Sequence, residues 1–348
     1  MIGDVFHADV GNPNELSFWW IVIIKALIVV IVMITLAAYL TLAERKVAAR
    51  IQLRIGPNRV GPFGMLQPAA DAVKMLFKEN VAPAGRDKLL YLVAPSIAAS
   101  AAFLAFAVIP VNGSQDSLLG VPLHWDIAHL NVGLLFILAV TSLGVYSIFL
   151  GGWSANSKYS LLGALRSSAQ LISYEMAVAF ALIGVVILSG SLDLEKIVEQ
   201  QQVTHWFVLM QPLAFVLYFT GALAETNRLP FDMAEAETEI VGGYHTEYSG
   251  MKFGLYFLGE YINMITVCSI ATVMFLGGWL PLFGFLGWIP GVVWFFAKVF
   301  TLLFVMMWIR WTLPRIRYDR LMNLGWKVLL PLGLVNIAIT GTIVALRA

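Results

Sequence analysis

Apolar segments of about twenty residues recur along this chain and are separated by shorter polar stretches. An α-helix needs about that many apolar residues to cross the roughly 30 Å hydrocarbon core of a bilayer. The strands of a membrane β-barrel would instead alternate apolar and polar residues over about ten positions, whereas these runs are continuous. The pattern predicts an all-α integral membrane protein, a single transmembrane domain over residues 1–348, with about eight transmembrane helices at 18–42, 89–110, 130–152, 166–189, 205–224, 251–277, 288–310 and 325–346.

The composition agrees with this class. Of the 348 residues, 59% are hydrophobic and 12% are charged, and the mean hydropathy is +0.81. A soluble domain has about twice that share of charged residues. The net charge of +1 hides an asymmetry, because eighteen of the 22 Lys and Arg residues fall on one side of the predicted spans. By the positive-inside rule the first, third, fifth and seventh loops are expected to be cytoplasmic, and both termini external.

The first predicted cytoplasmic loop, residues 43–88, begins with a basic stretch that two Gly-Pro pairs interrupt. Residues 65–80 then place Leu, Ala, Val and Phe on one helical stripe and Gln, Asp and Lys on the other. This pattern is typical of an amphipathic helix that lies in the interface plane with its apolar face down. For most residues of this predicted helix, the alternative to a functional role is simple anchoring to the membrane. It does not explain Asp71, because an acid gains nothing beside anionic headgroups.

The fifth loop, residues 225–250, is an acidic cytoplasmic loop with six carboxylates and a single arginine. A proline near its start, and the capping-box spacing of Asp232 with Glu235, predict a short acidic helix from about 232 to 241. In such a helix Asp232, Glu235 and Glu239 share one face. Glu237 points away. Like charges at this spacing repel, so we expect a raised carboxylate pKa or a partner, unless the segment is simply a solvated acidic loop.

Two further carboxylates, Glu175 and Glu260, fall near the middle of predicted spans. An ionisable residue there costs on the order of 3 kcal/mol or more, and it normally faces a bundle interior, a partner or a water-filled path. A protonated acid hydrogen-bonded between helices is the alternative. Glu44 and Glu225 come at the cytoplasmic ends of their helices. Together these acids form a series that suits a proton or cation path, because each step can bind and release charge.

The chain offers few ligands for a metal or a redox centre. Its single cysteine, Cys268, excludes a disulfide framework and a cysteine-ligated iron–sulfur cluster within this chain. Among the five histidines only His124 and His129 lie close in sequence, and their spacing is poor for one helical face. No Gly-rich phosphate loop, nucleophile elbow or nucleotide fingerprint occurs. We therefore expect no metal site, and we expect any electrons to come from another subunit.

Four long stretches carry a resemblance to a known family. They are AERKVAARIQLRIGPNRVGPFGMLQPAADAVKMLFKE, LLGALRSSAQLISYE, ALAETNRLPFDMAEAETEIVGGYHTEYSGMKFGLYFLGEY and LPRIRYDRLMNLGWKVLLPL. The chain resembles the H subunit (subunit 1) family of respiratory complex I, the proton-pumping NADH:quinone oxidoreductase, in its bacterial form. The resemblance runs from the first span to the last. A small departure is Met233-Ala234, where many members have Leu followed by Pro or Thr.

The resemblance implies a membrane subunit that forms part of the quinone chamber and couples quinone reduction to proton translocation. It implies ubiquinone or menaquinone as substrate, with NADH, FMN and iron–sulfur clusters only in partner subunits. Family roles in the quinone chamber fall on Arg45, Asp71, Phe257, Arg310 and Arg315. Family roles in the proton path fall on Glu175, Glu225, Arg228, Asp232, Glu235, Glu237, Glu239 and Glu260.

The resemblance also implies partners and a location. The partners are peripheral-arm subunits next to the terminal iron–sulfur cluster, small membrane subunits, antiporter-like subunits and the lipid of the bacterial inner membrane, with no nucleic acid. Related membrane-bound hydrogenases share the fold, so hydrogenase coupling is an alternative to quinone reduction. A cation-coupled transporter would show an inverted repeat and helices broken at the midplane, and neither is apparent. A purely structural anchor predicts that neutralising the deep acids affects assembly alone.

Overall fold

The structure is a computed structural model that describes residues 16–113, 117–118, 121–122, 126–233, 242–282 and 287–347. The α-helices are α1 (Leu16–Ile51), α2 (Gln67–Phe77), α3 (Lys88–Phe106), α4 (Gly133–Ser154), α5 (Lys158–Ser189), α6 (Leu194–Val203), α7 (Phe207–Met210), α8 (Pro212–Glu225), α10 (Met251–Phe275), α11 (Gly291–Thr312), α12 (Tyr318–Leu324) and α13 (Leu330–Arg347). Short elements are η2 (Pro62–Gly64), η3 (Gly243–His245), the π-helical η5 (Gly325–Leu329), and an antiparallel pair, β1 (Ser117–Leu118) with β2 (Val121–Pro122).

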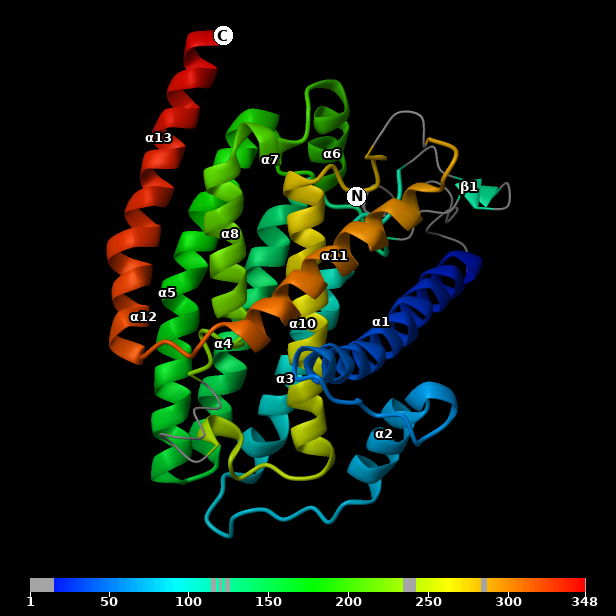
Figure 1. The fold of residues 1–348 in the computed structure, drawn as a ribbon, viewed down its shortest axis with the longest axis vertical. Coiled ribbons are helices and arrows are strands. Elements are labelled where there is room, and N and C mark those ends of the chain that lie inside the picture. The colour runs from blue at the N-terminus through cyan, green and yellow to red at the C-terminus, as the bar shows by residue number, and fades with distance from the viewer. Residues whose placement is uncertain are drawn as a thin grey trace.

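The prediction of an all-α membrane protein with about eight spans is confirmed. Among the described residues, seven helical segments are long and apolar enough to cross a membrane, and α8 is a shorter apolar helix. Figure 1 shows α3, α4, α5, α8 and α10 side by side, with α1 and α11 crossing one flank obliquely. On the opposite flank α13 runs along α5. The predicted interfacial helix is α2, which has no buried residue, as expected of an element that lies on a membrane surface.

Three of the helix boundaries show how the structure departs from the sequence prediction. Helix α1 continues to Ile51, nine residues past the predicted end, because Ala, Glu, Arg and Lys at its end all favour helix. Helix α5 begins at Lys158 rather than at 166. The predicted span 205–224 is interrupted between α7 and α8, where Gln211 leaves the helical conformation just before a proline. Helix α8 is therefore only about 21 Å long.

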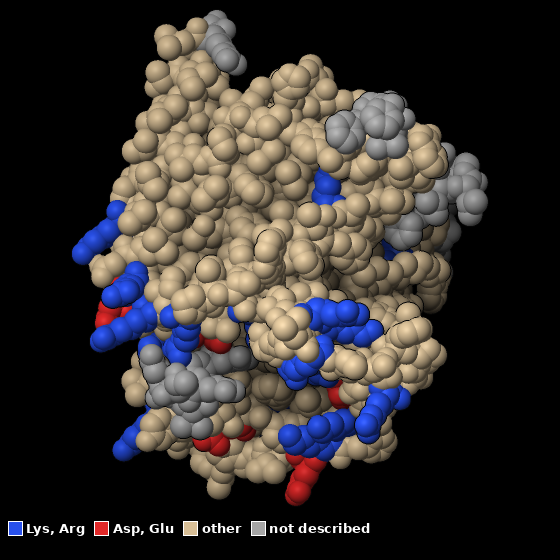
Figure 2. Space-filling model, viewed as in Figure 1, with Lys and Arg blue, Asp and Glu red and all other residues tan. Residues whose placement is uncertain are grey.

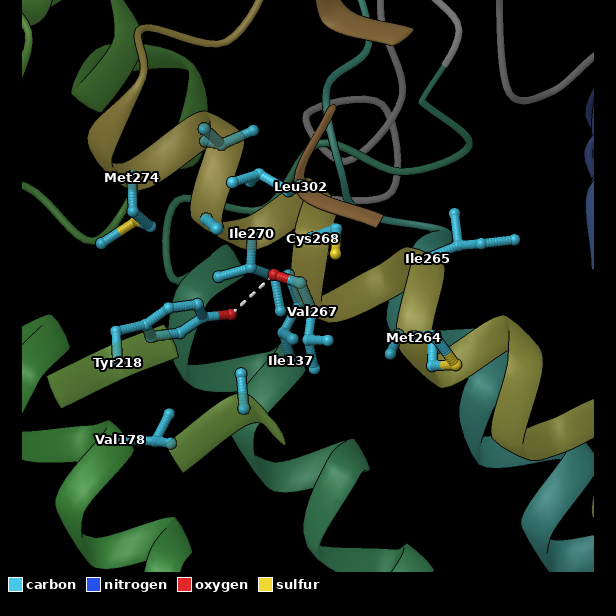
Figure 3. Packing of buried hydrophobic residues seen from close by; sticks show 14 of the residues in the cluster. Ile137, Val178, Tyr218, Met264, Ile265, Val267, Cys268, Ile270, Met274 and Leu302 are labelled. Carbon is cyan, nitrogen blue, oxygen red and sulfur yellow. Dashed lines mark hydrogen bonds between the residues drawn. The ribbon is translucent and has the colours of Figure 1, made fainter. Parts of the chain in front are cut away.

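Helix α10 lies at the centre of the hydrophobic core. Every residue from Met264 to Phe275 is buried, as expected of a helix that is apolar on all sides. Figure 3 shows its side chains packed among residues from α4, α5, α8 and α11. The hydroxyl of Tyr218 on α8 donates to the carbonyl of Val267 at 2.9 Å, which satisfies a polar group in this apolar region (Figure 3). This packing fixes the second half of α10, and Glu260 lies on the same helix just before the packed stretch.

Lys298 on α11 binds the backbone at the C-terminal end of α10. Its buried ammonium group donates to the carbonyl oxygens of Leu276, Gly278 and Leu280 at 2.7, 2.9 and 2.7 Å. It also lies 4.6 Å from the centre of the Trp206 ring. A cation at the C-terminus of a helix satisfies its last carbonyls and is favoured by the helix dipole. Lys298 is therefore paired with carbonyl oxygens, and it caps α10 from a neighbouring helix.

We expect Lys298→Met to destabilise the purified protein by about 3 kcal/mol, because several charge-assisted hydrogen bonds are lost and water replaces them only in part. Thermal unfolding in detergent measures the effect. Lys196→Met is the matched control, since the Lys196 side chain is 61% exposed. Equal unfolding midpoints for the two variants would contradict the capping role.

Candidate functional site

A pocket of about 100 Å³ lies among α3, α4, α5, α8 and α10 and holds three carboxylates. Glu175 comes from α5, Glu225 from the end of α8, and Glu260 from α10. The other lining residues include Thr141, Gly144, Thr226, Asn227, Tyr244, His245, Phe253, Tyr256, Phe257, Gly259 and Asn263. The structure thus brings together the two deep acids and Glu225, which are far apart in the sequence. We call this the carboxylate pocket.

Small and hydroxyl side chains shape the carboxylate pocket. The hydroxyl of Ser142 on α4 contacts Oε1 of Glu175. Gly259 brings α10 close to α3, because a Cβ there would lie 3.2 Å from the backbone carbon and oxygen of Ala98. A larger residue would push the helices apart and move Glu260, which is the next residue on α10. The close approach of α3 and α10 therefore sets the position of one of the three acids.

A second group of charges, the Glu44 cluster, adjoins the carboxylate pocket and consists of Glu44, Arg228, Glu260, Tyr261 and Arg310. Glu44 on α1 is only 4% exposed. Nη1 of Arg228 donates to both of its carboxylate oxygens at 3.1 Å, and the hydroxyl of Tyr261 donates to Oε2 at 2.6 Å. Nη1 of Arg310 pairs with Oε1 of the same carboxylate. On its other side, Nε of Arg228 lies 2.5 Å from Oε1 of Glu260.

The Glu44 cluster balances two guanidinium groups against two carboxylates inside the protein. Burial lowers the pKa of Arg228, but Glu260 and Glu44 raise it by more, so its pKa is above the ordinary value and it stays charged. The guanidinium carbon also lies 4.4 Å from the centre of the Tyr261 ring. Because α1, α10, α11 and the segment after α8 all contribute, the cluster ties four parts of the chain together. Glu260 belongs to both the cluster and the carboxylate pocket.

The residues predicted for the quinone chamber lie in different places. Arg45 and Asp71 form an ion pair, with Nη1 2.7 Å from Oδ2, and both side chains are partly exposed. Phe257 lines the carboxylate pocket. Arg310 belongs to the Glu44 cluster, and Nη2 of Arg315 lies 3.7 Å from the sulfur of Met233. The unusual acid on the amphipathic helix is therefore explained, because Asp71 has a basic partner from α1.

The acidic loop is only partly described. The short acidic helix predicted at 232–241 and the carboxylates of Glu235, Glu237 and Glu239 lie outside the described residues, apart from Asp232 and Met233. The start of the loop is held in place by Gln170 on α5. Its side-chain nitrogen donates to the carbonyl oxygens of Ala224 and Phe231 at 2.8 and 2.7 Å. This contact positions Arg228, which lies between those two residues.

Sequence reasoning missed the roles of two residues. From the sequence, Glu44 is a helix-end residue in the series of acids, but none of its partners can be identified. In the structure the carboxylate of Glu44 accepts hydrogen bonds from three side chains of the Glu44 cluster. The available signal is an acid at the end of a long apolar run, directly before Arg45. His245 has no ligand spacing, but it lines the carboxylate pocket. Burial lowers its pKa to about 4, so its imidazole is neutral near pH 7.

The low pKa of His245 predicts how stability depends on pH. An unfolded histidine has a pKa of about 6.5, so between pH 6.5 and 4 the unfolded chain binds more protons than the folded one. Stability is therefore lost as the pH falls through this window. We expect His245→Gln to lose less stability between pH 7 and pH 5 than the unaltered protein, measured by denaturant unfolding. The exposed His205 provides the control variant, His205→Gln, and the same pH dependence in both variants would contradict the assignment.

Comparisons with known proteins agree with this picture. The NADH dehydrogenase family model matches residues 24–341. The first of two H subunits of NADH-quinone oxidoreductase in Geobacter metallireducens is 54% identical, covering 93% of this chain and 96% of the relative. The first H subunit of Geobacter sulfurreducens is 52% identical, covering 93% and 95%, and the H subunit of Thermomicrobium roseum is 51% identical, covering 90% and 92%. The resemblance inferred from the four motifs is confirmed. The chain belongs to the NADH dehydrogenase family, which is the family of the H subunits of NADH-quinone oxidoreductase.

Proposed function

We propose that this chain forms part of the quinone chamber of an NADH-quinone oxidoreductase and couples quinone reduction to proton translocation through its carboxylates. The observation that carries the proposal is that Glu175, Glu225 and Glu260 share one pocket, while Glu260 also pairs with Arg228. The names of the curated relatives support quinone as the substrate class. In this proposal NADH, FMN and the iron–sulfur clusters belong to partner subunits.

The proposed chamber lies where α1 meets α2. Two-electron reduction of a quinone to a quinol consumes two protons, so acids close to the headgroup can supply protons or respond to the change in charge. Arg45 is partly exposed and can hydrogen-bond a quinone oxygen, while Asp71 sets the charge beside it. Gln67 donates to Oδ1 of Asp71 at 3.0 Å and fixes the orientation of that carboxylate. Phe257 lines the carboxylate pocket rather than this junction, and it would offer an apolar surface to a quinone ring that reaches inward.

Charged residues connect the region of this junction with the deep acids. Glu44 directly precedes Arg45 on α1 and binds Arg228. Arg228 contacts Glu260, and Glu260 shares the carboxylate pocket with Glu225 and Glu175. In the proposed mechanism a change of charge at the headgroup acts on the deep acids through these charged side chains. In the proposed mechanism these acids change their protonation as quinone is reduced.

The distribution of basic residues supports the proposed orientation. Figure 2 shows Lys and Arg gathered over the end of the bundle that holds α2 and α12. By the positive-inside rule this end faces the cytoplasm of the bacterial inner membrane, which places the first, third, fifth and seventh loops there. Peripheral-arm subunits would then dock at this end. Small membrane subunits and antiporter-like subunits would pack against the helices.

Photolabelling with an azido-quinone tests the proposal in native membranes. Peptides of this chain are mapped after illumination, with excess native quinone as competitor. We expect competed labelling between residues 45 and 78 or at Phe257, and weaker labelling in Asp71→Asn. The matched control is Asp87→Asn, outside the proposed chamber. Absence of competed labelling, in membranes that still reduce quinone, would contradict a chamber in this chain.

A further inference from the structure

We propose that Tyr174 on α5 is a positioning residue, which holds Glu175 in the carboxylate pocket by anchoring its turn of α5 to the start of the last membrane helix. The inference rests on the proposed function, because it takes Glu175 to act in coupled turnover. Tyr174 directly precedes Glu175 but does not line the pocket. Consecutive side chains of a helix point about 100° apart, and that of Tyr174 is fully buried on another side of α5.

The side chain of Tyr174 binds the segment formed by α12 and η5. Its hydroxyl donates to the carbonyl of Leu321 at 2.9 Å, and its ring lies against Gly325, where a Cβ would be 3.6 Å from the ring carbon Cε2. The hydroxyl of Ser173 accepts a hydrogen bond from Nε1 of Trp326 at 3.0 Å. Figure 1 shows α12 beside α5. Two adjacent residues of α5 therefore bind one short stretch of the last membrane helix.

The backbone of η5 makes this contact unusual. It is a π-helical turn, in which the backbone nitrogen of Leu330 donates to the carbonyl of Gly325, five residues earlier. Such turns are rare inside α-helices and are frequent at functional sites. The last membrane helix thus departs from regular α-helical geometry at the place where it binds the turn of α5 that carries Glu175.

Tyr174 also contacts the start of the acidic loop. The centre of its ring lies 5.6 Å from the centre of the Phe231 ring. The backbone nitrogen of Phe231 donates to the carbonyl of Arg228 at 2.8 Å, and its own carbonyl accepts from the side chain of Gln170, one turn before Tyr174. Tyr174 therefore lies between the segment that carries Arg228 and the turn that carries Glu175.

The contacts of Tyr174 favour a positioning role over proton transfer. Its hydroxyl proton is used for the carbonyl of Leu321, and a backbone carbonyl only accepts hydrogen bonds. Glu175 makes its own contact with the hydroxyl of Ser142 on α4. A shift of about 1 Å at a reacting group can lower a rate by roughly 10²-fold. Fixing the turn of α5 therefore matters for turnover even though Tyr174 does not reach the pocket.

The first test is Tyr174→Phe, which removes the hydroxyl and keeps the ring. The carbonyl of Leu321 keeps the backbone nitrogen of Gly325 as a donor, so no buried acceptor is left unpaired. We expect coupled NADH:quinone turnover per assembled complex to fall roughly tenfold, with a changed pH profile and an unchanged KM for quinone. Tyr159→Phe, at a 59% exposed position on the same helix, is expected to change neither turnover nor its pH profile. An unchanged pH profile in Tyr174→Phe, at any rate of turnover, would overturn the proposal.

The second test asks whether Tyr174 acts through Glu175. Independent effects on turnover multiply, whereas a residue that only positions Glu175 has nothing to position in Glu175→Gln. We expect Glu175→Gln/Tyr174→Phe to turn over as fast as Glu175→Gln alone. Trp326→Phe, which breaks the contact with Ser173 and leaves Tyr174 in place, takes the place of Tyr174→Phe if that variant does not assemble. A further tenfold loss in the double variant would overturn this inference alone, whereas normal turnover in Glu175→Gln would overturn the proposed function as well.

Discussion

Arg228→Gln is expected to lower the stability of the assembled protein by about 3–5 kcal/mol, because it leaves buried carboxylates without their charged partner. Arg228 is 4% exposed and contacts Glu44 and Glu260. After the substitution Arg310 still pairs with Glu44, but the cluster has one guanidinium group for two carboxylates. Denaturant unfolding of the purified complex, or the amount of assembled complex in membranes, measures the loss.

A double-mutant cycle separates the charge balance of the cluster from loss of packing. Glu44→Gln alone leaves an excess positive charge and is expected to destabilise. Glu44→Gln with Arg228→Gln restores the charge balance of the cluster, with one carboxylate, Glu260, and one guanidinium group, Arg310. We expect the double variant to be more stable than the sum of the single effects by about 1–3 kcal/mol. The exposed pair of Arg317 and Asp319 is the control, with a coupling below about 1 kcal/mol. Additive effects at Glu44 and Arg228 would contradict the cluster.

Glu260→Gln and Glu175→Gln are each expected to reduce coupled NADH:quinone turnover per assembled complex by roughly 10²-fold. Glu260→Gln also removes a charged partner of Arg228 and is expected to lower the amount of assembled complex. Glutamine keeps the size of glutamate and one acceptor oxygen but cannot take up or release a proton. Both residues line the carboxylate pocket, and neither is deeply packed in the main core. Turnover is measured in membranes with a quinone acceptor, at equal amounts of assembled complex.

Glu199→Gln is the matched control for these two variants, because Glu199 is exposed on α6, which contributes no residue to the pocket lining. Normal coupled turnover in both Glu260→Gln and Glu175→Gln would remove the carboxylate pocket from the mechanism. Loss of assembly in both, with normal turnover per assembled complex, would favour the structural anchor.

Much of the fold could be predicted from the sequence because its signal is local. A run of twenty apolar residues specifies a membrane helix without reference to any other segment. The end of α1 and the interruption before Pro212 depend on weaker local preferences, and there the predicted boundaries were wrong. The amphipathic stripe predicted α2 for the same reason that the spans were predicted, since its periodicity is visible within eleven residues.

The contacts of the site could be predicted only in part. The mid-span positions of Glu175 and Glu260 marked them as members of an internal site, since such residues are costly in lipid. The Glu44 cluster has no local signal, because Glu44 lies 184 residues from Arg228 and 266 residues from Arg310. Tertiary packing alone brings these side chains together. Asp71 is an intermediate case, because its position on an amphipathic helix indicated that membrane anchoring does not explain it but did not identify Arg45 as its partner.

Protons translocated per NADH oxidised in proteoliposomes test the coupling role of the carboxylate pocket most directly. The variant is Glu225→Gln, since Glu225 lines the pocket and lies at the end of α8, and Glu199→Gln is the control. We predict that Glu225→Gln oxidises NADH at a reduced rate and translocates fewer protons per NADH than the control. An unchanged ratio of protons to NADH, at any rate of turnover, would contradict the proposal that these carboxylates couple quinone reduction to proton translocation.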